Sequence, residues 1–159
     1  MSAKTPDTGA RTMKLNNIME ANVKTIGPSA TLRDAALLMK NESIGMLPVV
    51  DKNKVIGVLT DRDIVVRGLT TGSEQQRVRD IMTHNPVTLK PQDDTETAIK
   101  EMARHKIGRL ILVDGEHQLA GVVSATDIAS AAANPRSVNR LVKTLGRAHK
   151  EKERPLTKA

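Results

Sequence analysis

The sequence predicts an α+β fold built from two copies of one β-α-β-β-α unit. The first observation is a duplicated stretch, since residues 55–64 (VIGVLTDRDI) return as residues 119–128 (LAGVVSATDI). In both copies an apolar run rich in β-branched residues, typical of a buried strand, ends at a hydroxyl residue. An aspartate follows three positions later, where a helical pattern begins. A chain of 159 residues is long enough for two such units packed together.

The segments around this stretch also occur twice. We expect each copy to contain a helical turn, an extended segment, an amphipathic helix and a β-hairpin, in this order. In the first copy these lie at residues 14–19, 23–26, 32–39, 46–51 and 55–60, and in the second at 78–82, 87–90, 95–103, 109–114 and 119–124. Ser29 or Thr31 can cap the first helix, and each helix is expected to end near a glycine, Gly45 or Gly108.

The predicted domain organisation follows from these copies. We expect a disordered leader at 1–13, a first repeat at 14–69, a linker at 70–77, a second repeat at 78–133, and a C-terminal basic helix with a tail at 134–159. A repeat of about sixty residues is too small to bury both faces of its own sheet. The two repeats should therefore pack through their sheets with pseudo-two-fold symmetry.

Composition narrows the classes of function. The chain has no Cys, which excludes disulfide and thiol chemistry, and no Phe, Tyr or Trp, which excludes modules that stack nucleic-acid bases on aromatic rings. A base bound here must be held by aliphatic and Met side chains and by the backbone. The apolar runs are too short to span a membrane and the first residues lack a signal-peptide core, so we expect a cytoplasmic protein.

The net charge of +7 is concentrated at the ends of the chain. Residues 136–159 contain eight basic and two acidic residues, whereas residues 15–135 contain fourteen basic and fifteen acidic ones. Two interpretations of the terminal helix remain. It can pack an apolar stripe of Val138, Leu141, Val142 and Leu145 on the body or on a second subunit, or it can bind nucleic acid or anionic lipid. The absence of aromatic anchors and base-reading features favours packing.

The duplicated order of Ile-Met, Val-x-Thr, an amphipathic helix, Ile-Gly-x-Leu-x-Val-Val-Asp and Gly-Val-Leu-Thr-x-x-Asp-Ile resembles a pair of cystathionine-β-synthase (CBS) domains, also called a Bateman module. The resemblance covers about residues 14–133. It implies a stand-alone, non-enzymatic regulatory module. Its ligand would be an adenosine compound, namely AMP, ADP, ATP, NAD(H) or S-adenosylmethionine, bound in clefts between the repeats. It also implies a homodimer that passes ligand binding on to a regulated protein partner.

The hydroxyl and the carboxylate of the duplicated motif have two possible roles. Ser/Thr-x-x-acid at a helix start is a capping arrangement worth about 1 kcal/mol. A carboxylate can also accept hydrogen bonds from both ribose hydroxyls, and backbone N–H groups at a helix start suit a phosphate. By the resemblance, Asp63 and Asp127 match the ribose-binding position and Thr60 and Ser124 match the hydroxyl position. Capping and binding can coexist.

The same resemblance implies an adenine wall in each cleft. The first wall would consist of Asn22, Val23, Lys24, Ile44, Gly45, Met46 and Pro48. The second would consist of Asn85, Pro86, Val87, Ile107, Gly108 and Ile111. Val23 and Ile44 offer the apolar plates that a pocket without aromatic side chains requires.

The two clefts are not expected to be equal. Arg62 lies inside the first motif, where the second copy has Thr126, and its side chain is long enough to reach a phosphate. Arg109 matches a phosphate-facing basic position found in some family members. A surface salt bridge is the alternative for either arginine, for example between Arg62 and Asp61 or Asp63.

A second hypothesis from another class is an interaction protein. In that case the motif residues only cap helices, and the basic C-terminal helix binds an acidic partner or nucleic acid. An enzyme is disfavoured, because the chain has neither a Walker A loop nor a Gly-x-Gly-x-x-Gly fingerprint. Its four histidines lack metal-ligand spacing, so we expect no catalytic residue and no metal site.

Overall fold

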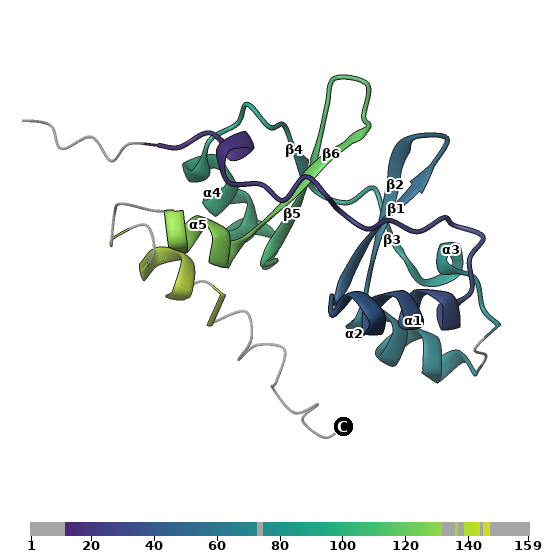
Figure 1. The fold of residues 1–159 in the computed structure, drawn as a ribbon. Coiled ribbons are helices and arrows are strands. Elements are labelled where there is room, and N and C mark those ends of the chain that lie inside the picture. The colour runs from purple at the N-terminus through teal and green to yellow at the C-terminus, as the bar shows by residue number, and fades with distance from the viewer. Residues whose placement is uncertain (1–11, 73–74, 132–135, 137–138, 144, 147–159) are drawn as a thin grey trace, which may run out of the picture.

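Two lobes, each a three-stranded sheet with helices packed on it, make up the computed structural model (Figure 1). The structure describes residues 12–72, 75–131, 136, 139–143 and 145–146. The first lobe contains α1 (Leu32–Glu42), β1 (Met46–Asp51), β2 (Lys54–Thr60), α2 (Asp61–Asp63), the π-helix η2 (Ile64–Gly68), the 3-10 turn η3 (Leu69–Thr71), α3 (Val78–Ile81) and β3 (Thr83–His84). The second lobe contains the 3-10 turn η1 (Leu15–Asn17), β4 (Thr88–Leu89), α4 (Thr95–His105), β5 (Arg109–Val113), β6 (Leu119–Ser124) and α5 (Ala125–Ala131). The predicted α+β architecture is confirmed.

The two long helices begin at side-chain caps. Thr31, not Ser29, caps α1, because its hydroxyl accepts from the Asp34 N–H at 3.1 Å while the Asp34 carboxylate accepts from the Thr31 N–H at 3.0 Å. Asp94 caps α4 by accepting from the Thr97 N–H at 2.9 Å. Both helices end in a left-handed residue, Ser43 or Lys106, with φ of 53° and 55°. The predicted glycines lie two residues further on.

Both sheets are built on an antiparallel hairpin, as predicted. β1 pairs with β2 and β5 pairs with β6, and each hairpin has an irregularity at the equivalent place, Val49/Val50 or Leu112/Val113. β3 adds an antiparallel edge to β2, and β4 adds a parallel edge to β5. The extended segment expected at residues 23–26 forms a single parallel bridge, between Ile26 and Val49.

The first segment of each repeat packs on the other lobe (Figure 1). Leu15 is fully buried in the core of the second lobe, and its N–H donates to the Asp93 carbonyl at 2.9 Å. Conversely, Val78, Ile81 and Met82 lie in the core of the first lobe. The packing units therefore do not begin where the sequence repeats begin, at residues 14 and 78.

Two glycines permit this exchange. A Cβ on Gly57 would lie 2.6 Å from the Met82 sulfur, and a Cβ on Gly121 would lie 2.9 Å from the Met19 sulfur. Such distances leave no room for a side chain, so the glycines let the exchanged segments lie directly on β2 and β6.

The sheets of the two lobes meet in a shared apolar cluster. Val55 from β2 and Ile111 and Val113 from β5 are buried there, and Met46, Val58 and Val122 pack around them. The predicted packing of the repeats through their sheets is confirmed. Met13, the last residue of the predicted leader, is bonded to the second lobe, since its carbonyl accepts from the Thr95 N–H at 2.9 Å. The rest of the predicted leader, residues 1–11, lies outside the described residues.

Helical residues of the C-terminal segment pack on the second lobe. Leu141 is 2% exposed within the core and Leu145 packs against it, whereas Val142 is 60% exposed. Arg140 forms an ion pair with Glu96 at 3.3 Å. Packing on the body is thus confirmed for two of the four predicted stripe positions. Val138 and the tail at 147–159 lie outside the described residues. Within the described part of the chain, no helix is long and apolar enough to cross a membrane.

Candidate functional site

Two pockets combine the motif of one repeat with the wall predicted for the other. The Asp127 pocket, of about 420 Å³, places Ser124 and Asp127 beside residues 22–24 and 44–46. The Asp63 pocket, of about 590 Å³, places Thr60 and Asp63 beside residues 86–87 and 107–108. This exchange is not visible in the sequence, because the repeats show which residues are equivalent but not which copies face each other.

The Asp127 pocket gathers most of the first predicted wall. Its lining includes Asn22, Val23, Lys24, Ile44, Gly45 and Met46, together with Arg109, Ser124 and Asp127. Glu20, Glu42, Ser43 and Val122 also line it and were not predicted. Pro48 is fully buried in β1 and does not line the pocket. It lies on the same face of the strand as Met46 but two residues further along, where its carbonyl accepts from the Ile26 N–H at 3.1 Å.

The Asp63 pocket gathers most of the second wall. Its lining includes Pro86, Val87, Ile107, Gly108 and Ile111, together with Thr60, Arg62, Asp63 and Arg109. Val58, Asp61, Thr83, His105 and Lys106 line it as well. Asn85 does not, because it adopts a left-handed backbone with φ of 46° and donates its N–H to the Ile56 carbonyl at 3.3 Å.

The motif side chains cap their helices in both copies. The Asp63 N–H donates to the Thr60 hydroxyl at 3.2 Å, and the Thr60 N–H donates to Asp63 Oδ2 at 2.9 Å. In the second copy the Asp127 N–H donates to Ser124 Oγ at 3.0 Å, and both the N–H and the hydroxyl of Ser124 donate to Asp127 Oδ2, at 2.7 and 2.6 Å. Each cap thus uses Oδ2 of its aspartate. The environment of the second oxygen, Oδ1, differs between the two copies.

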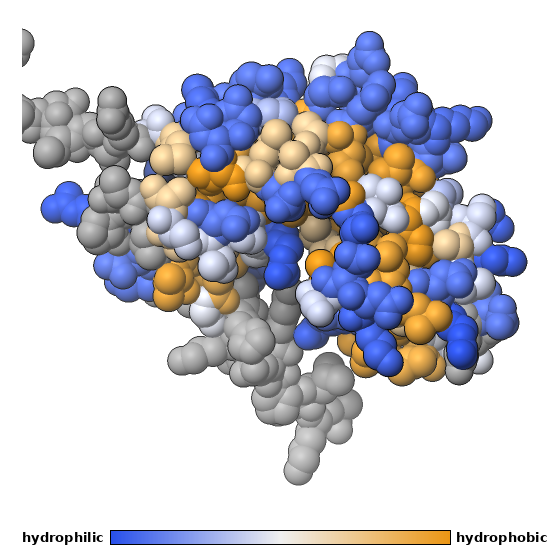
Figure 2. Space-filling view, viewed as in Figure 1, coloured by the Kyte–Doolittle hydropathy of each residue, from blue (hydrophilic) through white to orange (hydrophobic). Residues whose placement is uncertain are grey.

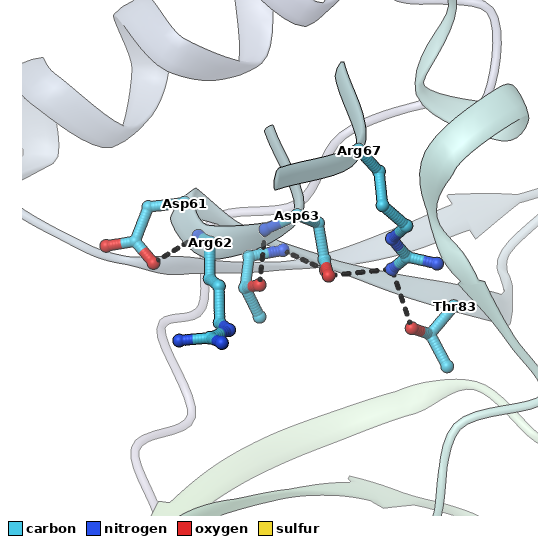
Figure 3. A network of polar contacts seen from close by, with 6 residues as sticks. Asp61, Arg62, Asp63, Arg67 and Thr83 are labelled. Carbon is cyan, nitrogen blue, oxygen red and sulfur yellow. Dashed lines mark hydrogen bonds and ion pairs between the residues drawn. The ribbon is translucent and has the colours of Figure 1, made fainter. Parts of the chain in front are cut away.

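That environment differs because of one arginine (Figure 3). Arg67 Nη2 donates to Asp63 Oδ1 at 2.7 Å and to the Thr83 hydroxyl at 3.2 Å. Oδ1 of Asp127 has no hydrogen-bond partner within the described part of the chain. Sequence reasoning missed Arg67, although its i,i+4 spacing from Asp63 on a helical segment is the expected signal of such a pair.

Arg62 is not the partner of the motif carboxylate. Its backbone N–H donates to Asp61 Oδ1 at 2.7 Å, while its guanidinium points away from Asp63 (Figure 3). The alternative of a salt bridge from Arg62 to Asp63 is therefore wrong, because Arg67 holds that position. The Arg62 side chain lines the Asp63 pocket instead.

The rims of the pockets also carry charge and a tight backbone contact. Lys24 and Glu42 form an ion pair of 3.6 Å at the Asp127 pocket. Gly45 lines both pockets, its carbonyl accepts from the Asp61 N–H at 3.1 Å, and a Cβ there would lie 2.8 Å from Asp61 Oδ2. Gly45 therefore lets the start of the first motif approach the wall closely.

Comparison with known proteins decides the family. The CBS domain family matches at residues 15–68 and 78–134, the two segments that carry the duplicated motif. The chain belongs to the CBS domain family. This CBS pair is 37% identical over 116 residues to the CBS domain-containing protein YhcV of Bacillus subtilis, covering 72% of this chain and 82% of YhcV.

Solved structures show the same fold. The CBS domain protein TA0289 of Thermoplasma acidophilum superposes with a TM-score of 0.74 at 23% identity, over 84% of this CBS pair and 76% of that chain. CBSX2, solved in complex with AMP, gives a TM-score of 0.66 at 25% identity, over 74% and 94% of the two chains. The CBS pair spans 22% and 23% of two archaeal inosine-5′-monophosphate dehydrogenases, so it matches only a minor part of those enzymes.

Proposed function

We propose that this CBS pair is a non-enzymatic regulatory module that binds adenosine-containing ligands in the Asp127 and Asp63 pockets. One observation carries the proposal. Each pocket sets a hydroxyl–carboxylate pair from one repeat against an apolar wall from the other. The ribose hydroxyls donate to the carboxylate, and the adenine lies on aliphatic side chains with its edge against exposed backbone.

The dimensions and the chemistry of the pockets support this ligand class. Volumes of about 420 and 590 Å³ fall within the usual range for small-molecule sites. Val23 and Ile44 line one pocket and Val87 and Ile107 the other, so both contain aliphatic surface for a base. Arg109 lines both and supplies positive charge for a phosphate. CBSX2, a relative of the same fold, was solved with AMP, which makes AMP the first ligand to test.

Regulation follows from the position of the pockets. Both lobes contribute to each pocket, so a ligand that contacts both sides stabilises one relative arrangement of the lobes. A protein partner that contacts both lobes would respond to this difference. The change transmitted is a shift in lobe arrangement or rigidity, with no chemical step in this chain.

We also propose a homodimer, formed through the face of α1 and η2. Leu37, Val65, Val66 and Leu69 are 45–65% exposed on this face, and Figure 2 shows orange side chains among blue ones in the lobe that contains α1. Leu32, Ala36 and Ile64 line a shallow groove beside them. A second copy presents the same apolar face, so a two-fold contact buries these side chains on both partners at once.

The interaction-protein hypothesis has less support. Leu141 of the basic helix is buried in the second lobe and Arg140 is paired with Glu96. The described part of that helix is thus engaged with the body. Helix capping uses one oxygen of each carboxylate, and Oδ1 of Asp127 remains able to accept from a ligand in its pocket.

Calorimetric titration tests the proposed function. AMP, ADP, ATP, NAD(H) and S-adenosylmethionine are titrated into the wild type, into an Asp63→Asn/Asp127→Asn double variant, and into Asp51→Asn as a matched control in the exposed β1–β2 turn. We expect at least one ligand to bind the wild type and the control. At a hundredfold excess over Kd, that ligand should stabilise the fold by about 2.7 kcal/mol. Equal binding by the double variant, or no binding by any protein, would refute the proposal.

A further inference from the structure

The two motif carboxylates accept their hydrogen bonds in different arrangements, and only Asp63 is paired with an arginine among the described residues. A carboxylate offers about four lone-pair positions, two on each oxygen. The Ser124 cap uses Oδ2 of Asp127, which leaves Oδ1 for two ribose hydroxyls. In the first copy the cap uses Oδ2 of Asp63 and Arg67 uses Oδ1. Oδ2 of Asp63 accepts one cap hydrogen bond, whereas Oδ2 of Asp127 accepts two, so Asp63 keeps one position on each oxygen, and its charge is already paired with Arg67.

The residues that create this difference are not repeated. Counted along the second copy with its offset of 64, Ala131 stands where the first has Arg67. Thr83 supports the arginine, and the bridge of Glu20 with Val122 puts Glu20 in the corresponding place beside β6. The surroundings of Asp63 thus contain a cation and a hydroxyl, while those of Asp127 contain a methyl group and a second carboxylate.

The charges lining the pockets differ in the same direction. Glu20, Glu42 and Asp127 line the Asp127 pocket against Lys24 and Arg109, and Lys24 is paired with Glu42. Asp61 and Asp63 line the Asp63 pocket against Arg62, Lys106 and Arg109, with His105 beside them. Arg67 adds a further positive charge at Asp63. A phosphate is therefore favoured in the Asp63 pocket more than in the Asp127 pocket.

We propose that Arg67 is a specificity-determining residue that makes the two pockets unequal. The Asp127 pocket recognises adenosine through its ribose diol and does not require phosphate. The Asp63 pocket binds ribose weakly while Arg67 occupies Oδ1, and it selects ligands by their phosphate groups. This inference rests on the proposed function, because it assigns different ligands to the two proposed sites.

Substitutions at residue 67 and at its equivalent, residue 131, test this inference. Binding is measured by calorimetry with adenosine, AMP and 2′,3′-dideoxyadenosine. In the wild type we expect adenosine to fill one site per chain, the Asp127 pocket. Arg67→Ala and Arg67→Met remove the donor to Oδ1 of Asp63, and both should strengthen adenosine binding in the Asp63 pocket by about fivefold. Ala131→Arg should weaken adenosine binding in the Asp127 pocket by a similar factor. The dideoxy compound, which has no diol, should not respond to either change.

Arg79→Ala is the matched control, since it removes an exposed arginine of α3 that lines neither pocket. Two equivalent adenosine sites in the wild type would overturn the inference while leaving the proposed function intact. Unchanged adenosine binding in folded Arg67→Ala and Arg67→Met would also overturn it. If no protein of the series binds adenosine or AMP, the inference and the proposed function both fail. Using two substitutions at residue 67 guards against a folding defect in one of them.

Discussion

Met46 and Arg109 occupy equivalent positions in the two repeats, and each lines both pockets. Met46 pairs with Thr60 across the first hairpin and Arg109 pairs with Ser124 across the second, at the first residue of β1 and of β5. The position between the pockets therefore carries one thioether and one guanidinium. Among the described residues that line the pockets, Arg109 is the one cation that both sites share.

Arg109→Met should make this position apolar in both copies. We expect AMP affinity to fall about tenfold, because a charge-assisted hydrogen bond to the phosphate is lost, while adenosine affinity stays within about twofold. Titration of each ligand separates the two effects. A matching loss of adenosine affinity would show that Arg109 acts on the shape of the pocket and not on the phosphate. Met46→Arg is the reciprocal variant and should favour AMP.

Leu15→Ala tests the exchange of first segments between the lobes. The side chain is fully buried in the second lobe, so its truncation should lower the free energy of unfolding by about 2–5 kcal/mol. Urea denaturation followed by far-UV circular dichroism measures the change. Val142→Ala, at a position 60% exposed, should cost less than about 0.5 kcal/mol. Similar small losses for both variants would contradict the observed packing of residues 14–20.

Asp94→Asn should change how stability depends on pH. The Thr97 backbone N–H, followed by the Thr97 hydroxyl, lowers the pKa of Asp94 from its ordinary value of 3.8. A lowered pKa in the folded state contributes stability that is present above 3.8 and is lost as the pH falls through the folded value. Asparagine keeps a capping oxygen but does not titrate.

Melting temperatures between pH 5 and pH 2 measure this effect. The acid-induced fall should be shallower in Asp94→Asn than in the wild type, with the difference confined to pH below about 4. Asp34 has a lowered pKa from its hydrogen bond with Thr31 and remains in both proteins, so part of the fall persists. Parallel curves for the two proteins would show that the Asp94 cap does not contribute to the fall of the melting temperature at low pH.

Val65→Asp and Leu69→Asp test the proposed homodimer. Charges on this apolar face should shift the protein to monomers in sedimentation equilibrium, because an unpaired carboxylate would be buried in the contact. Val142→Asp is the control, since Val142 is equally exposed but lies on the C-terminal helix. A wild type that is monomeric at all concentrations, or a dimer unaffected by both substitutions, would contradict the α1–η2 interface.

The fold was predictable because local patterns and the repeat agree. Thr31 and Asp94 cap helices of the expected spacing, and the hairpins follow the apolar runs. Two features depend on tertiary contacts instead. Leu15 belongs to the opposite lobe, which no local pattern encodes, and the walls consequently face the motifs of the other copy.

Among the predicted site residues, the departures have physical causes. Pro48 was expected in a wall but is fully buried, because it lies two residues further along β1 than Met46, where the segment around Ile26 pairs with the strand. Asn85 was expected in the second wall but turns away from the Asp63 pocket with a left-handed backbone. Arg62 was weighed as the partner of the motif carboxylate, whereas the helical spacing brings Arg67 to Asp63. Sequence adjacency was a poorer guide there than i,i+4 geometry.

A crystal structure of the protein grown with AMP tests the central claim most directly. The account predicts AMP in at least one pocket, with its ribose hydroxyls on the motif aspartate of one repeat and its adenine against the wall of the other. That wall contains Val23 and Ile44 in the Asp127 pocket, and Val87 and Ile107 in the Asp63 pocket. Empty pockets at saturating AMP would contradict it. So would a nucleotide whose base and ribose both contact the same repeat.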